Sequence, residues 1–254
     1  MKVIAHIRND FPTKFGVPHQ SGRLMELEAE IIFEPEYRNP DAFRGLEEYS
    51  HIWLIWEFSQ AVREEFSPTV RPPRLGGNIR KGVFATRSPF RPNPIGLSCV
   101  KLERVEFHPE LGPVLHVLGA DLMDKTPIFD VKPYLPYVDS HPDGTGAFTD
   151  RIEDHKLKVV FPPRLLARVP EEKREALMAV LADDPRPGYQ KDPDRVYGMG
   201  FGKQDIRFRV EEDVLTVCDV VSAKIPGNPR ENTPEPSGKM PGKSPGKFPV
   251  DKST

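Results

Sequence analysis

The sequence predicts a mainly β protein, in which an N-terminal β-barrel is followed by a smaller α+β domain. The first observation is period-two alternation in residues 24–33, where apolar side chains alternate with glutamates (Leu27, Ala29, Ile31 and Phe33 against Glu26, Glu28 and Glu30). The second is the high content of turn-forming residues, 29 prolines and 19 glycines, many of which stand between short apolar segments. Short strands between such breaks, with almost no helical periodicity, are typical of a closed or nearly closed barrel.

The other barrel strands are expected in short apolar segments of the first 138 residues. These segments are 2–7, 51–58, 82–86, 97–107, 113–119 and 127–132. One short helix is expected after Asn39-Pro40-Asp41, because proline is tolerated in the first turn of a helix. We therefore assign the barrel domain to residues 1–138.

The residue pattern of the chain changes after residues 139–150, which form a polar and turn-rich linker. A helix is predicted to open at Pro170 and to carry an apolar face. The segments 206–210 and 214–221 read as a hairpin, and the glycine-rich segment 197–203 as a bend ahead of it. These elements indicate a second, smaller α+β unit.

The α+β domain is assigned to residues 139–221, and a Pro/Lys/Gly-rich tail to residues 222–254. Almost no side chain of the tail is suited to burial, so the tail is predicted to be disordered. Its lysines leave two readings open, a weak accessory grip on RNA or a solvated segment without function, of which the second is favoured.

The overall composition does not indicate which kind of molecule the protein binds. The formal net charge is −2, so any contact with nucleic acid must come from a local basic patch. The two cysteines, Cys99 and Cys218, are read as buried thiols in a reducing compartment. With neither a signal-like apolar region at the start nor a long apolar stretch, a soluble cytoplasmic protein is expected.

The most distinctive stretch is the basic segment 68–98. Its arginines and lysine stand among six prolines and four glycines, and it contains no acidic residue. Proline fixes φ and glycine admits positive φ, so the backbone should follow a specified irregular path. Guanidinium groups displayed in this way suit phosphates, carboxylates or flat bases. The alternative is a flexible basic surface loop, which would normally contain Ser, Gly and Lys in place of the prolines.

Other motifs of nucleotide and metal enzymes are missing from the sequence. There is no Gly-x-Gly-x-x-Gly after a strand, no phosphate-binding P-loop, and no HExxH or HxH cluster among the histidines. No metal is therefore expected. Residue types and spacing alone indicate an all-β enzyme that binds a nucleotide or RNA.

A resemblance to a known family takes the interpretation further. The run VRPPRLGGNIRKGVFATRSPFRPNPIGLS (70–98) resembles the signature of the TsaA-like (TrmO-type) tRNA methyltransferases, and so do four other segments: GVPHQSG (16–22), FRGLEEYSHIWLIWEF (43–58), LGADLMDKTPIFDVKPYLPY (118–137) and DPRPGY (184–189). The similarity extends over about residues 1–220. It implies a barrel-type enzyme that moves a methyl group from S-adenosylmethionine (SAM) to N6 of threonylcarbamoyl-adenosine, beside the anticodon of tRNA, and that acts as a homodimer.

The resemblance also implies a set of SAM-binding residues. These are His19, Gln20, Ser21, Ser59, Gln60, Arg87, Leu97, Leu118, Gly119, Ala120 and Asp121. The small residues Gly119 and Ala120 would let backbone groups approach an adenine edge. Arg87 would pair with the methionyl carboxylate. Asp121 would accept from ribose hydroxyls or the ammonium group, and its alternative reading is a turn-capping aspartate.

Arg91, Asn93 and Lys132 are the candidates for binding the threonyl carboxylate or phosphates of the substrate, and no general base is assigned. Where relatives often carry arginine this chain has His19, which makes a weaker or pH-dependent contact there. Two alternatives to the tRNA reading stay open. One is a SAM-dependent methyltransferase of another RNA position or a small molecule, and the other is a non-catalytic RNA-binding or SAM-sensing barrel.

Overall fold

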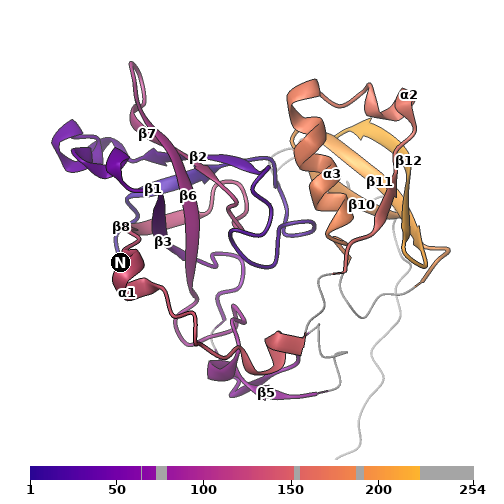
Figure 1. Cartoon of the computed structure of the whole chain (residues 1–254), viewed down its shortest axis with the longest axis horizontal. Coiled ribbons are helices and arrows are strands. Elements are labelled where there is room, and N and C mark those ends of the chain that lie inside the picture. The colour runs from indigo at the N-terminus through magenta and orange to yellow at the C-terminus, as the bar shows by residue number, and fades with distance from the viewer. Residues whose placement is uncertain (64, 73–78, 152–154, 187–191, 224–254) are drawn as a thin grey trace, which may run out of the picture. The chain divides into compact units, whose positions relative to one another are not determined.

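Six strands in the first part of the chain close into a barrel, in the order β1-β2-β7-β6-β3-β8 (Figure 1). The computed structural model describes residues 1–63, 65–72, 79–151, 155–186 and 192–223. All neighbouring barrel strands are antiparallel, and the pairing of β1 with β8 closes the ring. The strands are β1 (Ala5–Arg8), β2 (Glu28–Phe33), β3 (His51–Glu57), β6 (Ile95–His108), β7 (Gly112–Leu118) and β8 (Pro127–Pro133). The predicted barrel is confirmed.

Along the barrel strands every second side chain points into the interior, and most of these side chains are apolar. Ile31, Ile52, Leu54, Leu115 and Ile128 are all fully buried there. The alternation predicted for residues 24–33 is correct from Glu28 onwards. Before Glu28 the chain forms a turn, in which Leu27 N–H donates to the carbonyl of Leu24 at 3.3 Å, and both leucines are buried in a different core.

Two predicted elements take other forms. The predicted strand 82–86 is instead a two-residue ribbon, in which β5 (Lys81–Gly82) pairs with β4 (Thr69–Val70), followed by the 3-10 turn η5 (Val83–Ala85). The single helix expected after Asn39 consists of two short 3-10 turns, η2 (Pro40–Phe43) and η3 (Leu46–Glu48). Gly45 between them has φ 83°, a left-handed conformation that ends a right-handed helix.

A second sheet forms in the C-terminal part, in the order β10-β11-β12-β9. Its strands are β9 (Lys158–Val160), β10 (Tyr197–Phe201), β11 (Gln204–Glu211) and β12 (Val214–Ser222). The α-helices of the described residues are α1 (Pro136–Asp139), α2 (Pro163–Leu166) and α3 (Arg174–Ala182). The predicted hairpin is confirmed as β11–β12. A smaller C-terminal domain with a sheet is thereby confirmed.

The interpretation of residues 197–203 as a bend was wrong, because most of this segment is strand β10. The cause is composition: Tyr197, Met199 and Phe201 point into the core, and the positions between them are glycines, which resemble turn residues in the sequence. Strand β9, three residues long and parallel to β12, was not predicted. Cys218 is exposed rather than buried, because it lies on the outer face of β12.

The core of the C-terminal sheet includes side chains from the start of the chain. Phe11, Leu24 and Leu27 are buried in the same cluster as Met199 and Phe208, within the compact unit Met1–Ala223. These contacts fix both ends of the segment that carries His19, Gln20 and Ser21. The proposed domain boundaries stay a prediction, and residues 224–254 of the predicted tail lie outside the described residues.

Candidate functional site

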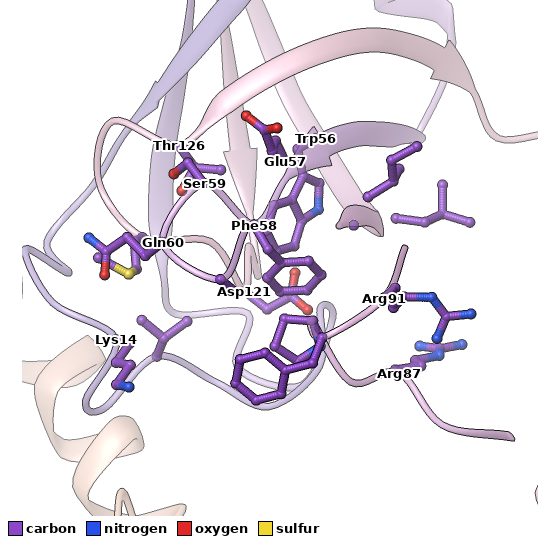
Figure 2. A pocket seen from close by; sticks show the side chains of 18 of the residues that line it. Lys14, Trp56, Glu57, Phe58, Ser59, Gln60, Arg87, Arg91, Asp121 and Thr126 are labelled. Carbon is purple, nitrogen blue, oxygen red and sulfur yellow. The ribbon is translucent and has the colours of Figure 1, made fainter. Parts of the chain in front are cut away.

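A pocket of about 800 Å³ opens at one end of the barrel (Figure 2). Four segments line it: the loop around residues 14–20, the end of β3 with the turn up to residue 63, the loop 86–91 with the start of β6, and residues 121–126 after β7. Figure 2 shows Arg87 and Arg91 on one side, Lys14 and Gln60 on the other, and Asp121 with Trp56 between them. The volume is within the range of small-molecule sites, which is about 300–1,000 Å³.

A chain of two hydrogen bonds organises the floor of the pocket. Trp56 Nε1 donates to Ser98 Oγ at 2.9 Å, and Ser98 Oγ donates to Asp121 Oδ1 at 2.5 Å. An indole N–H can only donate, so the hydroxyl proton of Ser98 is directed at the carboxylate. Ser98 is fully buried, at 0% exposure. The arrangement therefore fixes the side chains of Trp56 and Asp121 together.

Gly96 makes room for the Trp56 ring. The two residues are opposite each other in the β3–β6 register, and a Cβ on Gly96 would lie 2.2 Å from Cε2 of Trp56. An indole ring is rigid, so any side chain at position 96 would push Trp56 out of its place. Phe58 packs against Trp56 with ring centroids 4.2 Å apart. The two rings give the pocket an aromatic surface.

The carboxylate of Asp121 is held in surroundings that disfavour its charge. Burial raises the pKa of Asp121, and this is opposed by hydrogen bonds from Ser98 and from the backbone N–H groups of Asp121 and Ser21, and by the charge of Arg87. A cationic ligand in the pocket would stabilise the ionised form. The Asp121 carboxylate is thus a candidate to bind a positively charged group of a ligand.

The loop that carries Ser21 is attached to the segment before Asp121 through backbone contacts. Gly22 N–H donates to the carbonyl of Gly119 at 2.8 Å, and Gly119 N–H donates to the carbonyl of Leu27 at 2.9 Å. Gly119 has φ 76°, and a Cβ on it would lie 3.2 Å from Gly22. Glycine is favoured here first by the positive φ, and also by the close approach of the two chain segments.

The loop 83–91 is held by Arg91. Its Nη1 donates to the carbonyls of Val83 at 3.1 Å and of Thr86 at 2.7 Å. Arg87 Nη1 donates to Oε1 of Gln20, which links this loop to the opposite wall of the pocket. The two arginines, four residues apart, thus have different partners.

Seven of the eleven predicted SAM-binding residues line the pocket: His19, Gln20, Ser59, Gln60, Arg87, Leu97 and Asp121. Ser21, Leu118, Gly119 and Ala120 are not part of the lining, and Ala120 is buried. Of the predicted substrate residues only Arg91 lines it. Asn93 is exposed beside it, and Lys132 is paired with Asp130 at 2.8 Å on β8. The ligand contacts of all fourteen residues stay predictions.

Comparison with known proteins decides the family. The model of the tRNA-methyltransferase O N-terminal domain matches residues 6–140, which is more than half of the chain, and that of the TrmO C-terminal domain matches residues 154–223. The chain belongs to the tRNA-methyltransferase O family. The resemblance inferred from the sequence is thereby confirmed.

Relatives of known name match the chain over most of its length. The tRNA (adenine(37)-N6)-methyltransferase of Escherichia coli K12 is 40% identical over 217 residues, which is 82% of this chain and 92% of the relative. The putative S-adenosylmethionine-dependent methyltransferase RcsF of Pseudomonas aeruginosa PAO1 is 36% identical over 234 residues, or 85% and 95% of the two chains. The crystal structure of TrmO from Pseudomonas aeruginosa superimposes with a TM-score of 0.69 at 31% identity and covers 87% of this chain and 99% of that one.

Sequence reasoning missed Ser98 and Trp56 in this tRNA-methyltransferase O pocket. A signal for Ser98 was present: it occupies an inward position of a strand, between Gly96 and Val100, where an apolar residue is expected. Among the described residues no cluster of His, Cys, Asp and Glu could hold a metal ion, and no helix is long and apolar enough to cross a membrane.

The raised pKa of Asp121 gives a prediction about stability. Because the pKa of this carboxyl is higher in the folded state, its contribution to stability is complete below the ordinary aspartate pKa of about 3.9 and is lost as the pH rises through the folded pKa. Asp121→Asn removes the charge and keeps an acceptor for Ser98. Its melting temperature minus that of the wild type should increase from pH 4 to pH 7, by about 2–4 °C for each kcal/mol involved.

Thermal melts followed by circular dichroism at several pH values measure this difference. Asp130→Asn is the matched control, since Asp130 is a partly exposed carboxylate paired with Lys132. A difference between Asp121→Asn and the wild type that stays constant with pH would contradict the assignment.

Proposed function

We propose that this protein transfers the methyl group of SAM to N6 of threonylcarbamoyl-adenosine at position 37 of tRNA. Membership of the tRNA-methyltransferase O family makes it a SAM-dependent tRNA (adenine-N6)-methyltransferase. The observation that supports the finer reading is a pocket with a buried carboxylate, a guanidinium group and an aromatic surface, beside a loop rich in arginine.

The charges of the pocket fit SAM, which carries an ammonium group, a carboxylate and a sulfonium. Asp121 would bind a cationic group or ribose hydroxyls, and Arg87 would pair with the carboxylate. Trp56 and Phe58 offer aromatic faces that attract cations and flat rings. When bound, SAM supplies an electrophilic methyl group on its sulfonium.

The protein's own contribution is mainly alignment. The hydrogen bonds from Trp56 to Ser98 and from Ser98 to Asp121 prevent the carboxylate from rotating, and the bond from Arg87 to Gln20 joins two walls of the pocket. Holding two reactants in the correct position and orientation lowers the entropy cost of the reaction. Carbamoylation makes the target nitrogen more acidic, so cationic donors near the carbamoyl oxygens would stabilise the charge that develops as its proton leaves.

The acceptor is tested with two preparations of the same tRNA, one carrying threonylcarbamoyl-adenosine and the other unmodified adenosine at position 37. We expect methylation of the first and none of the second, as detected by mass spectrometry of the nucleosides. Equal methylation of both would contradict the threonylcarbamoyl requirement. Methylation at another position, or of a small molecule only, would support the broader reading of the site.

A homodimer is proposed as the active unit. Its support is the outward face of the barrel, where Ile55 is opposite Leu97 and Trp53 is opposite Cys99 in the β3–β6 register. Leu97, which also lines the pocket, is 57% exposed, and Tyr137 on helix α1 is 84% exposed. Apolar side chains on an outer barrel face are typical of a subunit contact. We expect a dimer at micromolar concentration in sedimentation, and a fully active monomer would contradict the proposal.

Mutation of Arg87 and mutation of Arg91 should have different effects on SAM affinity and on the Michaelis constant for tRNA. Arg87→Ala should weaken SAM binding about tenfold to a hundredfold, because a charge-assisted pair contributes about 1.5–3 kcal/mol. Arg91→Ala should raise the Michaelis constant for tRNA, because Arg91 is a predicted substrate residue, and should weaken SAM binding much less than Arg87→Ala does, because it acts on that site only through the loop carbonyls that it holds. Calorimetry in EDTA measures the first effect, and kinetics with tRNA measure the second. Equal losses of SAM affinity would contradict this division.

A further inference from the structure

A group of exposed or half-buried aromatic and arginine side chains lies at the mouth of the pocket. We call it the aromatic rim, and its members are Arg63, Phe66, Phe84, Phe90 and Arg91. Arg63 lies over the ring of Phe90 at 3.6 Å, and Arg91 lies 5.5 Å from the centroid of Phe84. Phe66 and Phe84 are stacked, with centroids 6.1 Å apart and planes inclined by 26°.

The rim begins in the pocket and continues outside it. Arg63, Phe90 and Arg91 line the pocket, whereas Phe66 and Phe84 do not. Phe84 is 71% exposed and Phe66 is 52% exposed. A ligand that fills the pocket and extends beyond it on this side would therefore reach the two stacked rings.

Folding does not account for the exposure of Phe84. Its neighbour Val83 is the residue of η5 that is buried, at 1% exposure, and it anchors the turn. Arg91 and Thr86 both bond to the carbonyl of Val83, so the backbone that carries Phe84 is fixed. A held turn that presents a large apolar ring to solvent is a feature of binding surfaces.

The chemistry of the rim fits single-stranded RNA. Sequence-specific and general binders of unpaired RNA stack bases on aromatic rings and on guanidinium planes, and bind phosphates with arginine. The segment 68–98, which supplies Phe84, Phe90 and Arg91, contains no acidic residue, so nothing in it repels a phosphate backbone. A protein partner that bound through apolar contacts alone would not need Arg63 and Arg91 beside the rings of Phe90 and Phe84.

We propose that the aromatic rim stacks unpaired nucleotides adjacent to the methylated adenosine, with Phe84 as the principal stacking residue. This inference rests on the proposed function, because it assumes that the target base enters the pocket from an RNA loop. It assigns to Phe66 and Phe84 a part in selecting RNA over a free nucleoside. The arginines of the rim then serve both as partners of the rings and as contacts for the phosphates between the stacked bases.

The first experiment measures tRNA methylation by Phe84→Ala, Phe84→Trp and Phe107→Ala. Phe107 is also a phenylalanine on the surface, 59% exposed, but it lies at the far end of β6 and outside the pocket lining. Phe84→Ala should raise the Michaelis constant for tRNA about five- to a hundredfold, as expected for loss of one stacked base, with SAM affinity unchanged. Phe84→Trp should restore it, and Phe107→Ala should resemble the wild type.

The second experiment needs no catalysis. An anticodon stem-loop with 2-aminopurine next to position 37 should lose fluorescence on binding the wild type without SAM, because stacking quenches this base. Phe84→Ala should bind more weakly and quench less. The salt dependence of binding should keep its slope, because the ring contacts no phosphate.

The outcomes separate the rim from the function itself. If the wild type methylates no tRNA, the proposed function fails. If the wild type methylates tRNA and Phe84→Ala does so with the same Michaelis constant, the rim proposal is overturned. It is also overturned if sedimentation shows that Phe84→Ala separates a dimer into monomers, which would make the rim a contact between subunits.

Discussion

The hydroxyl group of Ser98 is the one small group on which the pocket depends. It accepts from Trp56 and donates to Asp121, so a residue near the start of strand β6 connects strand β3 to the segment after β7. Removal of the hydroxyl would leave a buried indole N–H without an acceptor, which costs about 1–3 kcal/mol, and would take one of several donors from the Asp121 carboxylate. The aromatic wall and the charged floor of the pocket are therefore not independent features.

Much of the barrel could be predicted because its strands obey a simple physical rule. In β2 the buried residues Ala29 and Ile31 alternate with Glu28 and Glu30, and this alternation can be seen in the sequence itself. The failures have an equally physical cause. In β10 the alternating positions are glycines, which look like turn residues, and strand pairing stops after Gly82, where residues 83–85 form a turn with Val83 buried.

The site was predictable only as far as its chemistry is carried by charged or family-typical residues. Asp121 and Arg87 were found in this way, and both line the pocket. Ser98 was missed although its inward strand position was a signal, because its importance arises from two partners that are 42 and 23 residues away in the sequence. Gly119 was assigned to SAM binding by the family resemblance, and that contact stays a prediction; the structure adds that Gly119 has a positive φ of 76° and is hydrogen-bonded to Gly22.

The sharing of one core between the two ends of the chain has a consequence for synthesis. Phe11, Leu24 and Leu27 leave the ribosome early, but the side chains that cover them, such as Met199 and Phe208, come almost 200 residues later. The barrel strands are complete by Pro133, so the barrel can close while these three side chains are still in water. The loop with His19 and Gln20 is bonded to the barrel segments at Gly119 and Arg87, but the apolar side chains at its two ends are covered only when the last sheet forms. A prematurely terminated chain would therefore expose Phe11, Leu24 and Leu27 to solvent beside a completed barrel.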